Sequence, residues 1–144
     1  MTRTFLIGSA LVAVLTLGSA PAMAGKIKIE QWGWSNSAGG NQVGKKNRIG
    51  IHQNGSWNTG IAEQYGKRNT SAIGQDGYNN YGDTFQRGRN NAAGIGQFGS
   101  NHNAIITQDG NGNIAAGVQV GNGCDANVIQ AGHGNVAAFV QTCN

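Results

Sequence analysis

Residues 97–121 read QFGSNHNAIITQDGNGNIAAGVQVG, and in this stretch a glutamine recurs every eleven residues with a glycine two positions after it. The spacing continues in both directions without an insertion. Glutamine occupies Gln31, Gln42, Gln53, Gln64, Gln75, Gln86, Gln97, Gln108, Gln119, Gln130 and Gln141. Glycine follows the first ten of them at Gly33, Gly44, Gly55, Gly66, Gly77, Gly88, Gly99, Gly110, Gly121 and Gly132.

A third position of the unit is also regular, because asparagine lies five residues after the glutamine in eight of the ten units. These residues are Asn36, Asn47, Asn58, Asn69, Asn80, Asn91, Asn113 and Asn135. His102 and Cys124 take the other two positions. The unit is therefore Q-x-G-x-x-N-x-A-x-I-x, and ten copies in one register indicate an array in which each unit packs on its neighbours.

Glycine decides between helix and strand for this unit. A glycine in every unit would cost a helix roughly 1 kcal/mol apiece, so a helical array is rejected. As a strand, the positions five, seven, nine and eleven after each glutamine share one face, since side chains alternate along a strand. The glycine and the two residues after it are expected to form the turn. We therefore predict an all-β fold: a β-solenoid of about five coils, each of two strands and two turns, stacked about 4.8 Å apart.

The charged residues agree with this choice of inward face. None of the forty inward positions holds Asp, Glu, Lys or Arg, and an unpaired buried charge would cost several kcal/mol. The inward glutamines and asparagines would then stack in columns. Carboxamides can hydrogen-bond to one another along such a column, which satisfies groups that would otherwise cost about 1 to 3 kcal/mol each. These ladders would replace the aliphatic core that the composition lacks.

The chain divides into three predicted segments. Residues 1–24 carry Arg3, the apolar run Phe5–Leu17 and the small-residue site Ala22–Ala24, which is typical of a secretory signal peptide. Residues 25–30 form a short segment before the repeats, and residues 31–144 form the solenoid. The apolar run is too short for a membrane-spanning helix, and no other segment approaches the roughly 20 apolar residues required. We expect an exported protein with no membrane span.

The remaining charges suggest one surface. Lys45, Lys67 and Arg89 recur every 22 residues, so they should stack along one turn edge. Either they are solvated charges that slow uncontrolled assembly, or they form a basic stripe for anionic matrix polymers. We favour the first interpretation.

Two cysteines remain, Cys124 and Cys143. Cys143 aligns with residue 121 of the coil below, so the two thiols should lie near the same turn, within reach of a disulfide. Free thiols, or a metal site that adds His102, are the alternatives. Three ligands without a fourth are weak for zinc. We therefore expect no metal and no cofactor.

Two other classes of function find less support. The six acidic residues fall at scattered outward positions without a facing pair, so no catalytic residues are predicted. A monomeric solenoid that binds polysaccharide or another surface ligand is the alternative to an assembling one. Such a binder would keep its ends capped, whereas here the repeat runs from Gln31 to Gln141 without a proline or a bulky polar cap. Open strand edges favour stacking into a cross-β fibre.

The units resemble those of the curlin family, whose repeats carry Gln, Gly, Asn and Ala at the spacing seen from Gln31 to Gln141. This resemblance implies a secreted functional amyloid that builds extracellular fibres at the bacterial cell surface for adhesion and biofilm matrix. It implies that the inward glutamines and asparagines are the polymerisation residues, and that the partners are further copies of the chain, a companion fibre subunit and an outer-membrane secretion pore. The bulk subunit and the nucleator share the repeat, so both roles stay open.

Overall fold

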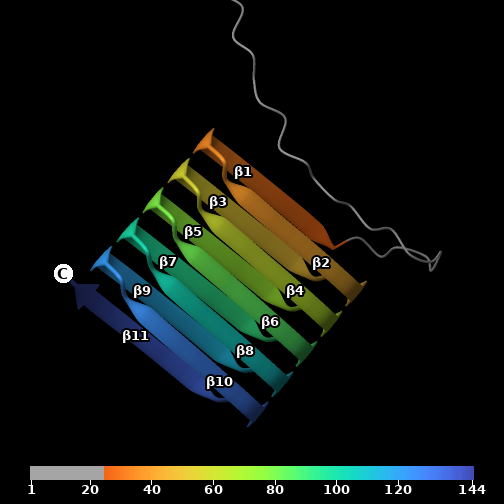
Figure 1. Ribbon diagram of the computed structural model, residues 1–144. Helices are drawn as coiled ribbons and strands as arrows, with labels where there is room; N and C mark the ends of the chain where they lie inside the picture. The colour runs from red at the N-terminus through yellow and green to blue at the C-terminus, as the bar shows by residue number, and fades with distance from the viewer. Residues whose placement is uncertain (1–24) are drawn as a thin grey trace, which may run out of the picture.

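The structure, a computed structural model, describes residues 25–144; the expected signal peptide lies outside these residues. The described chain forms eleven strands joined by short turns (Figure 1). The strands are β1 (Lys26–Trp34), β2 (Ser37–Lys45), β3 (Arg48–Ser56), β4 (Thr59–Lys67), β5 (Thr70–Tyr78), β6 (Tyr81–Arg89), β7 (Ala92–Ser100), β8 (Asn103–Asn111), β9 (Ile114–Asn122), β10 (Asp125–His133) and β11 (Val136–Cys143). The all-β prediction is confirmed.

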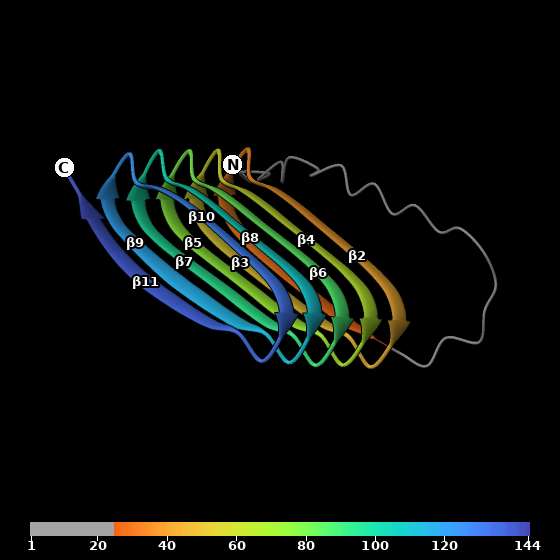
Figure 2. The same cartoon turned by 90° about the horizontal axis from the view of Figure 1, so that it is seen from below.

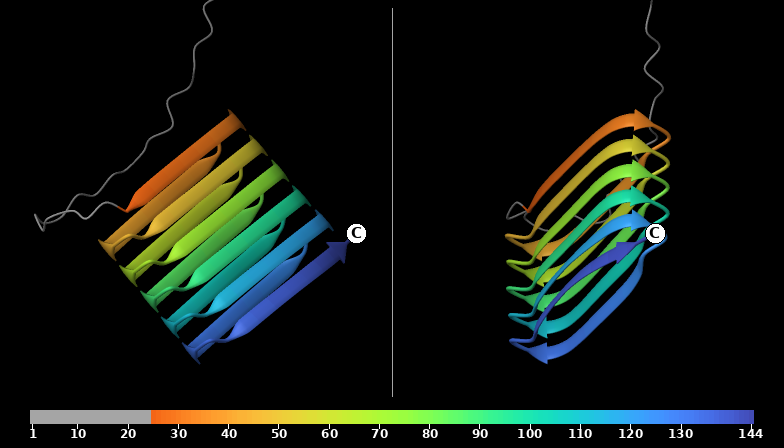
Figure 3. Two further views of the ribbon diagram at one scale, coloured as in Figure 1. Left: turned by 180° about the vertical axis from the view of Figure 1, so that it is seen from behind. Right: turned by 90° about the vertical axis from the view of Figure 1, so that its left-hand side faces the viewer.

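Odd-numbered and even-numbered strands separate into two parallel sheets. The six-stranded sheet has the order β1-β3-β5-β7-β9-β11, and the five-stranded sheet has the order β2-β4-β6-β8-β10. Successive strands run in opposite directions on opposite sides of the coil (Figure 2). The chain advances steadily along the stack, so residue number rises from one end to the other (Figure 3). This is a parallel β-solenoid of about five turns, as the period of eleven predicts.

The register between strands follows the repeat. Each strand pairs with the strand two places later, so that Gln53 lies beside Gln75 and Gly55 beside Gly77. The partners are 22 residues apart, which makes one coil equal to two units. Every unit therefore places its side chains directly over those of the unit two places earlier.

The solenoid begins earlier than the first glutamine of the repeat. β1 starts at Lys26 and pairs along its length with β3, so most of the segment assigned to residues 25–30 lies in the first strand. Ile27 and Ile29 stand beside Ile49 and Ile51, which extends two inward columns to this end. The alternating charges of KIKIE face outward on the same strand. The alternation of charged and apolar residues, rather than the spacing of the glutamines, is the sequence signal for this strand.

The turns also differ in position from the prediction. The strand continues through the glycine, and the turn is made by the fourth and fifth residues after the glutamine, such as Ser35 and Asn36. The fourth residue has a left-handed φ in every unit, for example 54° at Ser35 and 61° at Trp57. Glycine bends the strand two residues before the turn, with φ of 105° at Gly33. Each corner of the coil thus contains two positive φ angles.

The core is thin and mixed. Its buried apolar residues are Ile49, Ile51, Ala62, Ile73, Ala93, Ile95, Ala104, Ile106 and Ala115. Between them lie the buried glutamines and asparagines of the central coils. Those nearest the two ends are partly buried or exposed, namely Gln31, Gln42, Gln141, Asn36 and Asn135. Large residues face small ones, since Ile51 and Ile73 line the six-stranded sheet where Ala62 and Thr84 line the other. Within residues 25–144, no helix is long and apolar enough to cross a bilayer.

Candidate assembly surface

The glutamines form two continuous ladders, one inside each sheet. The Nε2 of each glutamine donates to the Oε1 of the glutamine 22 residues later, at 2.7 Å from Gln53 to Gln75 and 2.8 Å from Gln75 to Gln97. The same Nε2 donates its other hydrogen to a backbone carbonyl 16 residues earlier, as Gln75 does to Thr59 at 2.9 Å. Gln75 is 1% exposed. Each rung is therefore satisfied along the stack and across to the preceding strand.

The asparagines form a second pair of ladders at the corners. The Oδ1 of each asparagine accepts the backbone N–H of the corresponding residue one coil later, as Asn58 does from Asn80 at 3.1 Å. Its Nδ2 donates to a glycine carbonyl 19 residues later, as Asn58 does to Gly77 at 3.0 Å. The asparagine thus joins two coils and holds the bend of the strand. Among residues 25–144, every buried side-chain polar atom has a hydrogen-bond partner.

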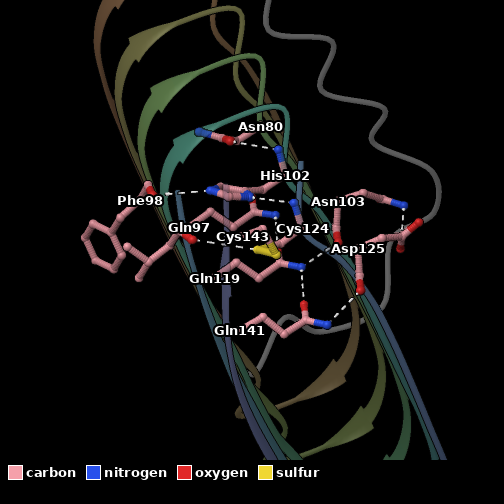
Figure 4. Close-up of a disulfide and its surroundings, with 11 residues drawn as sticks. Asn80, Gln97, Phe98, His102, Asn103, Gln119, Cys124, Asp125, Gln141 and Cys143 are labelled. Carbon is pink, nitrogen blue, oxygen red and sulfur yellow. Dashed lines mark hydrogen bonds between the residues drawn. A yellow bond between two sulfur atoms is a disulfide. The ribbon is translucent and has the colours of Figure 1, made fainter. Parts of the chain in front are cut away.

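His102 replaces asparagine in this ladder with nearly the same connections. Its Nδ1 accepts the backbone N–H of Cys124 at 3.1 Å, and its Nε2 lies 3.2 Å from the carbonyl oxygen of Phe98 (Figure 4). Because Nδ1 accepts, the ring proton must be on Nε2, which donates to Phe98. The ring supplies one donor where asparagine supplies two, so it makes no bond to the carbonyl of Gly121.

Cys124 takes the next position of the same ladder and forms a disulfide with Cys143, with the Cα atoms 5.5 Å apart. The bond ties β11 to the turn before β10. His102 lies one coil below Cys124, where the spacing places it, but the two sulfurs are joined to each other. No group of three or more metal-binding side chains occurs within residues 25–144.

The glycines of the repeat are packed against one another. A methyl group at Gly77 would lie 1.9 Å from the carbonyl oxygen of Gly99, and similar close approaches recur at nearly every repeat glycine. Gly132 is the exception, since the chain places no residue above it and the nearest atom is 3.8 Å away. The close stacking of the coils at this corner therefore requires glycine for space as well as for φ.

Both ends of the solenoid leave ladder groups without partners in the described chain. At one end, Gln31 and Gln42 donate to the next coil, but their Oε1 atoms accept no hydrogen bond from residues 25–144. At the other end, Gln130 and Gln141 donate only to backbone carbonyls, since the described residues hold no glutamine 22 positions after either of them. One end therefore presents acceptors and the other presents donors. The sequence predicts the ladders, and the structure shows their direction.

The charged residues lie at outward positions of the strands and at the turns. Lys45, Lys67 and Arg89 are stacked in register at the end of β2, β4 and β6, as the spacing of 22 predicts. On the outward face, the side-chain hydrogen bond from Arg87 holds the pKa of Asp109 below its usual range.

Asp83 behaves in the opposite way. Burial, and then the negative charge of Glu63, raise the pKa of Asp83 above its usual range. The sequence indicates scattered outward acidic residues without a facing pair, and the packing of β4 beside β6 brings Glu63 and Asp83 close enough to repel. Their outward position on the sheet is nevertheless the predicted one.

Within residues 25–144, the glutamine ladders thus end in donors without a partner glutamine at one edge and in acceptors without one at the other. Comparison with known families agrees with this arrangement, since residues 47–77 and 77–110 match a family model described as the curlin associated repeat. The match confirms the predicted resemblance over this central part of the chain. No curated protein matches the chain.

Proposed function

We propose that this chain, which carries curlin associated repeats at residues 47–110, is a self-assembling subunit of extracellular fibres of the curli type. The observation that carries the proposal is the polarity of the two ends. Within residues 25–144, the glutamines of β10 and β11 have no glutamine to donate to, and those of β1 and β2 accept from none. A second copy placed end to end supplies what each edge lacks.

The exposed backbone edges add to this complementarity. β1 and β2 end the two sheets on one side, and β10 and β11 end them on the other. An unpaired parallel edge is a template for another strand. Because all strands have nine or eight residues and the same register, an added copy continues both sheets without a change of shape. The product is a cross-β fibre with strands perpendicular to its axis.

Family membership of the repeat supports the wider role. Curlin repeat proteins are structural and extracellular rather than catalytic. We infer that this chain acts outside the cell in adhesion and biofilm matrix, as either a bulk subunit or a nucleator. A companion subunit and an outer-membrane secretion pore are the partners that this role would need. Anionic matrix polymers are candidate ligands of the basic stripe formed by Lys45, Lys67 and Arg89.

Assembly of residues 25–144 tests the proposal. The protein is purified in denaturant, diluted into buffer and followed by amyloid-dye binding and sedimentation, and aligned material is examined by fibre diffraction. We expect fibres with a reflection near 4.7 Å along the fibre axis. Material that stays monomeric would favour the alternative of a surface-binding solenoid instead.

A pair of matched variants links assembly to the ladder ends. Gln130→Glu combined with Gln141→Glu keeps an acceptor toward the chain's own ladder but removes the donor at the open edge, together with the bonds to the carbonyls of Ile114 and Asp125. Ala131→Glu combined with Thr142→Glu adds the same charge one residue along, on the outward face. We expect the first pair to slow fibre growth far more than the second. Equal slowing by both pairs would assign the effect to charge rather than to the ladder.

A further inference from the structure

The number of strands within residues 25–144 is odd, and this determines how two copies of this solenoid can meet. Six strands lie in one sheet and five in the other, so the described solenoid extends half a coil beyond its last complete turn. The next vacant strand position lies beside β10 in the five-stranded sheet. The first strand of the chain, β1, belongs to the six-stranded sheet.

We propose that a second copy docks with its β1 on β10 and its β2 on β11, so that successive copies in the fibre are related by a half-turn about the fibre axis. This inference rests on the proposed end-to-end assembly and specifies its partner and register. The six-stranded sheet of one copy then continues into the five-stranded sheet of the next. If the second copy instead kept the same orientation, with β1 on β11, the position beside β10 would stay empty. Two strands would then lose a whole ladder of backbone hydrogen bonds.

The side-chain ladders match in this register. The step of 22 residues that separates stacked partners places Gln31 of the second copy on Gln130 and Gln42 of the second copy on Gln141. The Nε2 donors at one edge therefore meet the Oε1 acceptors at the other. Asn135 similarly meets Asn36 of the second copy, which extends the asparagine ladder of that corner.

The core gives an independent argument, because its large side chains change sides within the chain. The six-stranded sheet contributes Ile29, Ile51, Ile73 and Ile95 and then Gly117 and Phe139, while the five-stranded sheet contributes Gly40, Ala62 and Thr84 and then Ile106 and Val128. A half-turn places Ile29 of the second copy on Val128, so the column of large residues continues on the same side. Within each chain the large aliphatic side chains move from the six-stranded to the five-stranded sheet, and at each junction the six-stranded sheet of the next copy continues the five-stranded one. The two changes compensate for each other.

Phe139 shows the fit most directly. Its ring covers Gly117, where an added methyl group would lie 1.9 Å from the ring, so the coil below must have no side chain there. The half-turn register places Gly40 of the second copy above Phe139, and no side chain meets the ring from that side either. The same-orientation register would place Ile29 of the second copy there. The ring of Phe139, an inward-facing and partly buried side chain, is therefore accommodated between two glycines.

The outward face of the junction carries opposite charges. Lys26 begins β1 and Asp125 begins β10, and the half-turn register makes them direct neighbours across the two copies. Both are exposed, and Asp125 accepts one hydrogen bond from Asn103 at 3.2 Å. Lys26 has no ion-pair partner within residues 25–144. A direct cross-strand pair of opposite charges stabilises the pairing modestly.

Zero-length carbodiimide cross-linking of unmodified fibres tests the register. The reagent joins an amine to a carboxylate only when the two are in contact, and peptide mass spectrometry identifies the product. We expect a linkage between Lys26 and Asp125 that is absent from freshly diluted monomer. Fibres that lack this linkage, or that link Lys26 to another carboxylate, would overturn the half-turn register while leaving fibre formation intact. Failure to form fibres would instead contradict the proposed function.

Charge reversal and imaging complete the test. Asp125→Lys and Lys26→Glu should each slow fibre elongation about two- to fivefold, and the two together should restore it. Asp76→Lys, in the middle of the chain, is the matched control and should not be rescued by Lys26→Glu. Helical reconstruction should give a half-turn and a rise of about 26 Å per subunit. A symmetry without the half-turn would overturn the proposal.

Discussion

Cys124 is joined to Cys143 across 19 residues, which is the separation at which Asn113 donates to the carbonyl oxygen of Gly132. The disulfide thus occupies the place of the asparagine–glycine hydrogen bond that joins coils elsewhere. Closing a loop of this length stabilises by about 3 kcal/mol in the chain-entropy account. We expect Cys124→Ser with Cys143→Ser to release β11, with faster hydrogen exchange at residues 136–143 and unchanged exchange in β5.

The control for this prediction rebuilds the repeat. Cys124→Asn with Cys143→Gly introduces the residues that other units carry at these two positions, so the hydrogen bond can replace the covalent one. Exchange in β11 should then be intermediate between the disulfide-bonded chain and the serine variant. The same protection in all three proteins would show that the disulfide contributes nothing to the order of the last strand.

A central rung of the glutamine ladder should carry much more free energy than an outward hydrogen bond. Gln75 accepts from Gln53 and donates to Gln97 in the buried interior, whereas Asn54 donates to Asp76 at 3.2 Å on the exposed face. Gln75→Ala leaves buried donors and acceptors unpaired, at about 1 to 3 kcal/mol for each group. We expect a large fall in the urea concentration that dissociates half of the fibres, and little change for Asn54→Ala.

Two glycines of the six-stranded sheet should respond in opposite ways to the same substitution. Gly77 has φ of 133° and its methyl group would collide with the carbonyl of Gly99, whereas Gly94 has open space around it. Gly77→Ala should therefore abolish ordered assembly. Gly94→Ala should be tolerated, because the added methyl restricts the unfolded chain without a native clash. Dye-binding yield and urea resistance compare the two, and equal loss in both would contradict the close-packing account.

The period of eleven was sufficient to predict the coil, the inward face and the identity of the ladder residues. Gln53, Asn58 and Ile73 lie where alternation and the absence of inward charge place them. The strand boundaries were harder to predict from the sequence, because a glycine with φ of 100° or more can bend a strand without ending it. The turn therefore falls two residues later than the glycine suggests.

The donor-to-acceptor direction of the ladders could not be predicted, because the repeat pattern identifies equivalent positions without showing which residue donates to which. Each ladder glutamine donates to the glutamine of the next coil toward the C-terminal end, from Gln31 at one edge to Gln141 at the other. Only the structure shows this direction. The role of His102 as an asparagine substitute was equally hidden, although its position in the column was a usable signal. β1 was missed because Lys26 and Lys28 lie outside the glutamine register while still alternating with Ile27 and Ile29.

Acid should stabilise the packing around Asp83. Because burial and the charge of Glu63 raise the pKa of Asp83, the native state binds this proton more tightly than the unfolded chain, whose aspartates have a pKa of about 3.9. Stability should therefore fall as pH rises from that value through the raised native pKa, and stay lower above it. Asp83→Asn should remove this dependence from the urea resistance of the fibres, and Glu63→Gln should reduce it. An unchanged pH profile in Asp83→Asn would show that another group is responsible.

The stacked cations at the end of β2, β4 and β6 should slow assembly at low salt. Lys45, Lys67 and Arg89 follow one another in register, at the inter-strand spacing of about 4.8 Å, well within the Debye length of about 10 Å at 0.1 M salt. Their repulsion opposes folding of the coils that bear them, and added salt screens it. Replacing all three with glutamine should accelerate fibre growth at low salt and flatten its salt dependence, measured by dye-binding kinetics. Replacing Lys28, Arg48 and Arg87 in the same way keeps the change in net charge but leaves the column intact, so it should flatten the salt dependence less. Equal effects of the two triple variants would assign the barrier to net charge rather than to this column.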